Sequence, residues 1–178
     1  MHSFEAEALI LAGTPTVWDI LTDAGNYAVW ESGIVAAHGD MVSGGRIRVQ
    51  TRERSRKSLS VLVGLSEGKS MTWTYGLPLR LARVVRTFTL TDYSGVTYLA
   101  VKEKVTGPLR RLVHKSGPDA SEALADFVEA VRFRAELLSF HLDGGVFPAA
   151  APTGTSQRHG RQAPPFTVRS LQQSNFGR

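Results

Sequence analysis

The chain has 178 residues, of which 42% are hydrophobic and 8% are aromatic, enough to bury the core of one ordinary domain. It contains no cysteine, so disulfide bonds, thiolate zinc sites and cysteine nucleophiles are excluded. The net charge is +5 at pH 7, but residues 1–144 carry 17 basic and 16 acidic side chains. The positive excess therefore lies mainly in residues 145–178, and we expect no specific nucleic-acid partner.

The two ends of the chain give expectations for its location and its domain boundary. Residues 1–7 carry acidic side chains where a secretory signal has basic ones, and no stretch reaches the roughly 20 apolar residues that span a bilayer. We therefore expect a cytoplasmic protein without integral membrane association. Residues 145–178 are rich in Pro, Gly, Gln, Ser and Thr, which predicts one domain over residues 1–144 followed by a disordered basic tail.

The first 30 residues predict one strand and two short helices. Alternating apolar residues between Ser3 and Leu11 indicate a strand with one buried face. Thr14 and Pro15 are typical of a helix N-cap and a first helical position, so we expect a short helix from Pro15 to about Thr22. A second short turn of helix is expected at residues 27–30, after turn-forming residues.

The middle and the C-terminal part of the domain predict a sheet and its cover. Residues 44–107 alternate apolar and polar positions between glycine-containing turns, which indicates five consecutive antiparallel strands with one apolar face. Apolar residues then recur at helical spacing from Leu124 to Leu138, which indicates a long helix over about residues 118–142. Together these patterns predict an α+β fold, in which the helix covers a curved antiparallel sheet.

Several short motifs in this order are features of a known superfamily. They are residues 12–23, Tyr27 with Trp30, Met71-Thr72-Trp73, Arg86-Thr87-Phe88-Thr89-Leu90, Gly95-Val96-Thr97 with Glu103, and Gly107-Pro108-Leu109. With them the chain resembles the START-like, or SRPBCC, superfamily, in particular its bacterial polyketide cyclase/dehydrase and lipid-transport branch. The resemblance implies a helix-grip fold, with a curved sheet wrapped around a long C-terminal helix and two short helices after the first strand.

The resemblance also implies a hydrophobic cavity between the sheet and the helix. Its expected ligand-binding residues are Trp30, Trp73, Tyr75, Arg86, Phe88, Leu99, Val101, Glu103, Phe127 and Val131. The apolar members are also ordinary core residues, so only their joint enclosure of a space favours a binding site.

Two charged residues lie in otherwise apolar rows. Arg86 has the same parity as Phe88, and Glu103 has the same parity as Val101, on strands that are neighbours in a hairpin. We therefore predict an ion pair on the cavity wall, able to orient a ligand or, with Tyr75, to act in acid–base chemistry. The alternative is a solvated, structural pair near the rim of the sheet.

Three functions follow from these patterns together with what the resemblance implies. The first is binding of a small hydrophobic ligand such as a lipid, a polyketide or an aromatic metabolite. The second is a cofactor-independent cyclase or dehydrase of polyketide type that uses Arg86, Glu103 or Tyr75. The third is a protein-interaction module that uses the tail or a basic row, which comprises Arg46, Arg48, Arg52, Arg54, Arg56 and Lys57.

Other features predict neither a metal nor a cofactor. The five histidines are scattered without the spacing of metal ligands, and no phosphate-binding loop or nucleophile elbow occurs. The pattern leaves both a monomer and a homodimer open.

Overall fold

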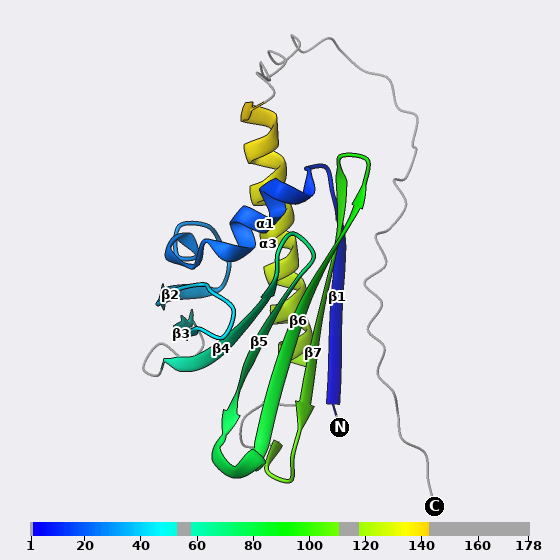
Figure 1. Ribbon diagram of the computed structural model, residues 1–178. Helices are drawn as coiled ribbons and strands as arrows, with labels where there is room; N and C mark the ends of the chain where they lie inside the picture. Colours follow the sequence, from blue (N-terminus) through cyan, green and yellow to red (C-terminus); the bar gives the residue numbers. More distant parts are fainter. Residues whose placement is uncertain (1, 53–57, 111–117, 143–178) are drawn as a thin grey trace, which may run out of the picture.

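The computed structural model describes residues 2–52, 58–110 and 118–142 (Figure 1). Within these ranges, seven strands form one antiparallel sheet in the order β1-β7-β6-β5-β4-β3-β2. The strands are β1 (His2–Ile10), β2 (Ile34–His38), β3 (Arg46–Thr51), β4 (Leu59–Ser66), β5 (Ser70–Leu77), β6 (Ala82–Tyr93) and β7 (Val96–Thr106). The helices are α1 (Thr14–Thr22) and α3 (Pro118–Leu142), with the 3-10 turns η1 (Ala24–Asn26) and η3 (Pro78–Arg80). No helix in the described ranges has both the length and the hydropathy of a membrane span.

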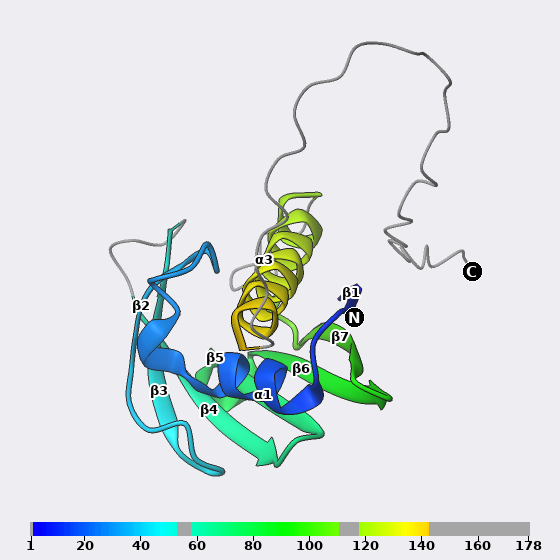
Figure 2. The same cartoon turned by 90° about the horizontal axis from the view of Figure 1, so that it is seen from above.

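The sheet curves around the long helix. Figure 2 shows the curvature from β2 and β3 round to β1, with α3 over the concave face. Helix α3 packs mainly against β1 and α1, so it lies toward the β1 side of that face. The helix-grip arrangement and the span of the long helix that the sequence predicts are therefore confirmed.

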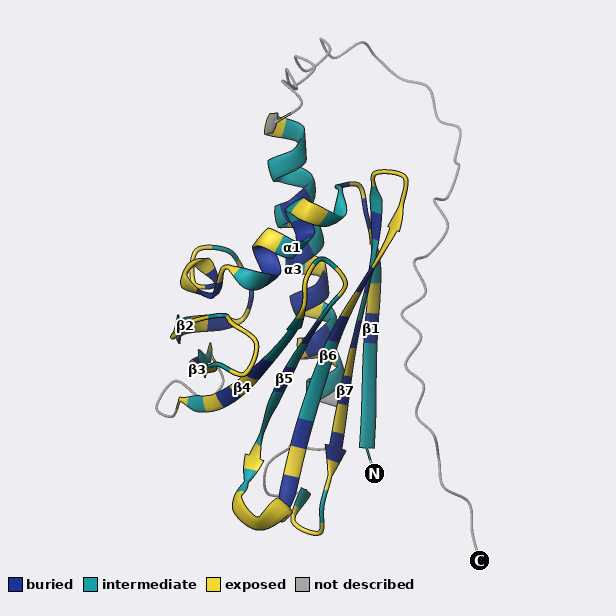
Figure 3. Ribbon diagram, viewed as in Figure 1, coloured by how far each residue is buried: buried dark blue, intermediate teal, exposed yellow. Residues whose placement is uncertain are grey.

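The main core lies between α3 and the concave face (Figure 3). The buried helix residues are Leu124, Phe127, Val128, Val131 and Ala135, whose three- and four-residue spacing places them along one stripe. They pack against apolar side chains from every second residue of the strands, because successive side chains of a strand point to opposite faces of the sheet. Each large apolar side chain buried here contributes about 1.5–3 kcal/mol to folding.

Two details near the N-terminus correct the expectations. Helix α1 begins at Thr14 and its N-cap is Gly13, so Thr14 is not the cap. The Thr14 hydroxyl instead lies 3.3 Å from the hydroxyl of buried Thr97, which donates a hydrogen bond to the Ala12 carbonyl at 2.7 Å. The second short helix is η1 at residues 24–26, and residues 27–30 form turns.

Strand β2 is an element that the alternation does not predict. Its pairing with β3 contains a register shift between Ile34 and Ala36, and only Ile34 and Ala37 are buried. Because a bulge breaks the two-residue period, this short strand has no alternating signature. The predicted tail at residues 145–178 lies outside the described residues.

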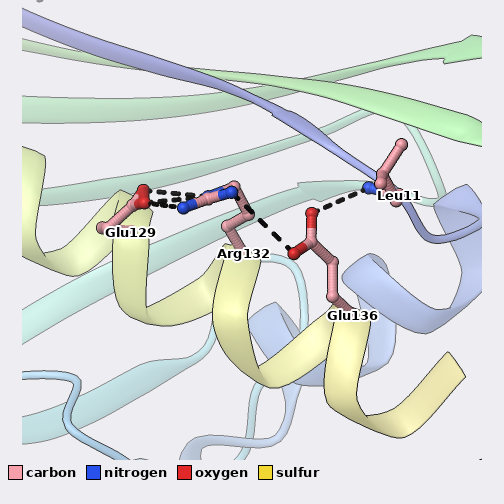
Figure 4. A network of polar contacts seen from close by, with 4 residues as sticks. All are labelled: Leu11, Glu129, Arg132 and Glu136. Atoms are coloured by element: carbon pink, nitrogen blue, oxygen red, sulfur yellow. Dashed lines mark hydrogen bonds and ion pairs between the residues drawn. The ribbon is translucent and has the colours of Figure 1, made fainter. Parts of the chain in front are cut away.

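A polar network fixes α3 against the end of β1 (Figure 4). Arg132 Nε donates to both carboxylate oxygens of Glu129, at 2.8 and 3.0 Å, and Arg132 Nη1 lies 3.8 Å from Glu136 Oε2. The other Glu136 oxygen accepts a hydrogen bond from the Leu11 backbone N–H at 3.1 Å. Exposed ion pairs contribute less than about 1 kcal/mol, so this network sets the position of α3 more than the stability of the fold.

Candidate functional site

Four strands contribute one residue each to a row across the concave face. Trp73 of β5 lies directly opposite Arg86 of β6, which lies opposite Glu103 of β7, which lies opposite Phe4 of β1. Val84 lies two residues before Arg86 and pairs with Val105, which lies two residues after Glu103. Both valines are closer to one end of the sheet than the ion pair, and both are fully buried. The row therefore lies inside the concave face and not at the rim of the sheet.

The predicted ion pair between Arg86 and Glu103 is present. Arg86 Nε and Nη2 both lie 2.7 Å from Glu103 Oε2, and the side chains are 22% and 3% exposed. Burial alone would lower the pKa of Arg86, but the Glu103 carboxylate and then the Tyr75 phenol act in the opposite direction, so the pKa is raised overall. Arg86 therefore stays charged, and one face of an otherwise apolar site carries a permanent ion pair.

Five aromatic side chains pack next to this pair. Phe88 lies two residues after Arg86 on the same face, and its ring centroid is 5.3 Å from that of Trp73 and 5.8 Å from that of Phe127. Trp30 lies 5.8 Å from Phe127 and 5.5 Å from Tyr27. Most of these contacts are edge-to-face or tilted, which suits the quadrupoles of the rings. The cluster joins the β1–β2 connection, the sheet and α3.

Tyr27 is the member of this cluster that the sequence analysis does not assign to the site. It is fully buried, lies 5.9 Å from Trp73 and 6.2 Å from Phe127, and donates its hydroxyl hydrogen to the Leu21 carbonyl. Burial, and secondarily the charge of Asp23, raises the pKa of Tyr27. Its spacing from Trp30 in the motif of the superfamily is the signal that could have identified it. Because its hydroxyl is already bonded, Tyr27 supplies shape to the site and no free donor.

Trp73 provides a donor without an acceptor. Its indole Nε1 is buried and has no hydrogen-bond partner among the described residues. A buried, unsatisfied donor costs about 1–3 kcal/mol, so it needs an explanation. Together, the Arg86–Glu103 pair, Trp73 and the aromatic cluster of Tyr27, Trp30, Phe88 and Phe127 form what we call the concave site.

The remaining expected ligand-binding residues lie on the same face at different depths. Leu99, Val101 and Val131 are fully buried in the main core, on the side toward β1. Tyr75 and Trp30 are half-buried, and Tyr75 packs against a second small core of Ala82, Val84 and Val105. Trp73, Phe88, Phe127 and Glu103 are buried to a similar degree. Among the expected ligand-binding residues, only Trp30, Tyr75 and Arg86 keep exposed surface.

Three residues of the basic row, Arg46, Arg48 and Arg52, lie among the described residues. Arg46 and Arg48 are exposed on the outer face of β3, and exposed Arg52 pairs with Glu31 at 3.1 Å. Arg54, Arg56 and Lys57 lie outside the described residues. The described part of the row is therefore a solvated surface, as such rows usually are.

Solved structures with the same fold include three whose descriptions bear on this chain. A protein from Mesorhizobium loti, MLL2253, has a TM-score of 0.60 at 20% identity, over 82% of this chain and 100% of that one. A START superfamily protein from Mycobacterium smegmatis has a TM-score of 0.59 at 16% identity, over 78% and 99%. The di-domain ARO/CYC StfQ of the steffimycin biosynthetic pathway has a TM-score of 0.59 at 12% identity, over 77% and 52%. At these identities the likeness shows the fold alone.

Sequence comparison identifies the family. No curated protein matches the chain by sequence. The family described as polyketide cyclase / dehydrase and lipid transport matches residues 1–137, which include every residue of the concave site. Together with the curved seven-stranded sheet and the long C-terminal helix, this match shows that the chain belongs to the polyketide cyclase/dehydrase and lipid transport family and has the START-like helix-grip fold.

Proposed function

We propose that the chain reversibly binds a small, mostly apolar molecule that carries at least one hydrogen-bond acceptor, in the concave site between the sheet and α3. The unpartnered indole N–H of Trp73 is the observation that carries this proposal. A carbonyl or hydroxyl oxygen of a ligand would satisfy the buried donor. Lipids, polyketides and aromatic metabolites all combine such an oxygen with a large apolar surface.

The surroundings of Trp73 support the same class of ligand. Trp30 and Tyr75 keep part of their surface exposed, so a ligand that covered them would remove apolar area from water. Arg86 lies directly opposite Trp73 in the sheet and is also partly exposed. Its guanidinium has five N–H donors, of which the contacts with Glu103 use two groups, so Arg86 offers a second donor for the same oxygen.

A competition experiment tests the hydrogen bond separately from apolar burial. The neutral dye Nile red would report uptake, and anthraquinone and anthracene would compete as a matched pair with and without carbonyl oxygens. Trp73→Phe should lower the affinity for anthraquinone about fivefold, which corresponds to the loss of one hydrogen bond, and leave the affinity for anthracene unchanged. Trp18→Phe, a half-buried tryptophan on α1, is the matched control and should change neither. Equal losses for both competitors would remove Trp73 from the proposal, and absence of any dye uptake would contradict the binding function.

A cyclase or dehydrase is the second candidate, and one observation favours it. Tyr75 lies two residues after Trp73 on the same face of β5, diagonally across from Arg86 on β6, so a phenol and a cation share this part of the apolar face. Such a pair is suited to stabilise an enolate oxygen while a proton moves. Turnover of an aromatic polyketide chain that is lost in both Tyr75→Phe and Arg86→Met would favour this candidate, whereas unchanged ligand after long incubation would favour a carrier.

A further inference from the structure

The β5–β6 turn and the residues that follow β7 meet at one end of the sheet, at the bottom of Figure 1. We call residues 78–83 and 106–110 the tip. Three leucines project there: Leu79 is 91% exposed, Leu81 is 37% exposed and Leu109 is 39% exposed. Figure 3 shows the exposed turn between β5 and β6. Soluble proteins seldom gather exposed leucines without a partner, so this surface indicates an interaction.

The tip is held together by backbone contacts. The Leu109 N–H donates to the Leu81 carbonyl at 2.8 Å, which joins the two loops. Gly107, at φ 102°, lies so close to the turn that an added Cβ would stand 2.5 Å from the same carbonyl oxygen. The two loops therefore present their leucines from one fixed base.

The backbone of the turn keeps Leu79 pointing outward. Leu79 and Arg80 have φ angles of 56° and 58°, which residues other than glycine rarely adopt. No buried packing explains this conformation, because both side chains are exposed. Strain of this kind is frequently kept at functional positions.

The charge around the leucines is uniformly positive. Residues 76–85 and 104–110 contain Arg80, Arg83, Lys104 and Arg110 and no aspartate or glutamate. Arg80, Arg83 and Lys104 are exposed, and none of them has a carboxylate partner among the described residues. By contrast, Lys102 on the same outer face pairs with Glu5 at 3.1 Å. Arg80 and Arg83 at the tip, and Lys104 next to it, are therefore available to anionic groups.

We propose that the tip docks on a lipid surface that carries anionic headgroups, with Leu79 inserted among the headgroups and Arg80 and Arg83 bound to phosphates. A leucine that projects from a tight turn and is followed by Arg80 and Arg83 fits a soft, anionic interface better than the flat surface of an acidic protein. The inference uses residues outside the concave site, so it stands or fails independently of the proposed ligand.

A site-specific reporter tests the insertion directly. Because the full chain has no cysteine, Leu79→Cys gives a unique position for an environment-sensitive NBD dye. With vesicles of phosphatidylcholine and phosphatidylglycerol, NBD emission should rise and shift to the blue. The control is Phe133→Cys, at a residue 70% exposed on the outer side of α3, where emission should not change. Equal changes at both positions, or no change at position 79, would overturn the proposal.

Vesicle sedimentation of the unlabelled chain tests the contributions of the arginine charges and of the inserted leucine separately. Arg80→Gln and Arg83→Gln should each lower partitioning into anionic vesicles about fivefold, and Leu79→Ser at least about tenfold. Phe133→Ser should leave it unchanged, and pure phosphatidylcholine should bind the wild type weakly. Loss of partitioning in Phe133→Ser, or full retention in Leu79→Ser, would show that the tip is not the docking surface. Binding of an acidic protein without any binding of vesicles would also overturn it.

Discussion

Replacement of Glu103 by leucine should destabilise the protein far more than loss of one contact would suggest. The carboxylate is 3% exposed, and without it the Arg86 guanidinium would remain on an apolar face with no counter-ion. Breaking a buried ion pair costs about 3–5 kcal/mol, and the 22% exposure of Arg86 favours the lower end, about 3 kcal/mol. Arg86→Met removes the cation next to the more deeply buried carboxylate and should cost about 4 kcal/mol.

The double variant Arg86→Met, Glu103→Leu distinguishes a buried pair from two independent contacts. Apolar replacements of similar size remove both desolvation penalties, so the free energy of unfolding of the double variant should lie within about 1 kcal/mol of that of the wild type. Urea unfolding of the four proteins, followed by circular dichroism, gives the coupling energy, which from these losses should be at least about 6 kcal/mol.

The chain offers a matched surface pair as the control. Glu5 and Lys102 also face each other across neighbouring strands at 3.1 Å, but their side chains are 34% and 50% exposed. Their coupling energy should be below about 1 kcal/mol. If the Arg86–Glu103 coupling were as small as that of the control, the pair would be a solvated structural contact and the polar anchor of the concave site would be refuted.

Two further perturbations test the scaffold around the site. Tyr27→Phe removes the hydroxyl bonded to the Leu21 carbonyl and should cost about 1 kcal/mol at pH 7. Burial raises the pKa of Tyr27 above its usual 10.0, so this residue should stabilise the wild type fully below pH 10 and less at higher pH. The urea midpoint of unfolding should therefore fall less between pH 8 and pH 11 in Tyr27→Phe than in the wild type. Parallel declines of the two midpoints would contradict this. Gly76 has a φ of 155°, and a Cβ at this position would collide with the Ala82 carbonyl. Gly76→Ala should therefore lower the free energy of unfolding by more than about 2 kcal/mol. Gly68, at φ 66°, has open space around it, so Gly68→Ala should lower the free energy of unfolding by only about 1 kcal/mol. Equal losses of melting temperature in the two variants would contradict the close approach of Gly76 to the Ala82 carbonyl.

The sequence predicts the parts of the fold that repeat with a fixed period. Six strands and the long helix follow from two- and 3.6-residue patterns, and the ion pair follows from the parity of Arg86 and Glu103. Strand β2 has no such pattern because a bulge interrupts its pairing. Tyr27 lies in a turn, where burial depends on contacts with α3 and the sheet and not on local periodicity. The unpartnered N–H of Trp73 is a property of three-dimensional packing alone.

The alternation of residues along a strand also does not predict how deeply each residue of the concave face is buried. Residues of one parity share a face, but the position of α3 toward β1 decides which of them are packed and which stay partly open. Leu99 and Val101 lie in the packed part, whereas Tyr75 and Arg86 keep exposed surface. Trp30, Tyr75 and Arg86 are therefore the better candidates for ligand contacts.

Native mass spectrometry of the full chain, after incubation with an extract of lipids and aromatic polyketides, tests the central claim most directly. The wild type should retain an added small-molecule mass that is released on unfolding. The stable double variant Arg86→Met, Glu103→Leu should retain much less of it, because the polar anchor of the concave site is gone. Bare wild-type protein at every ligand concentration, or equal retention by the wild type and the double variant, would contradict the account.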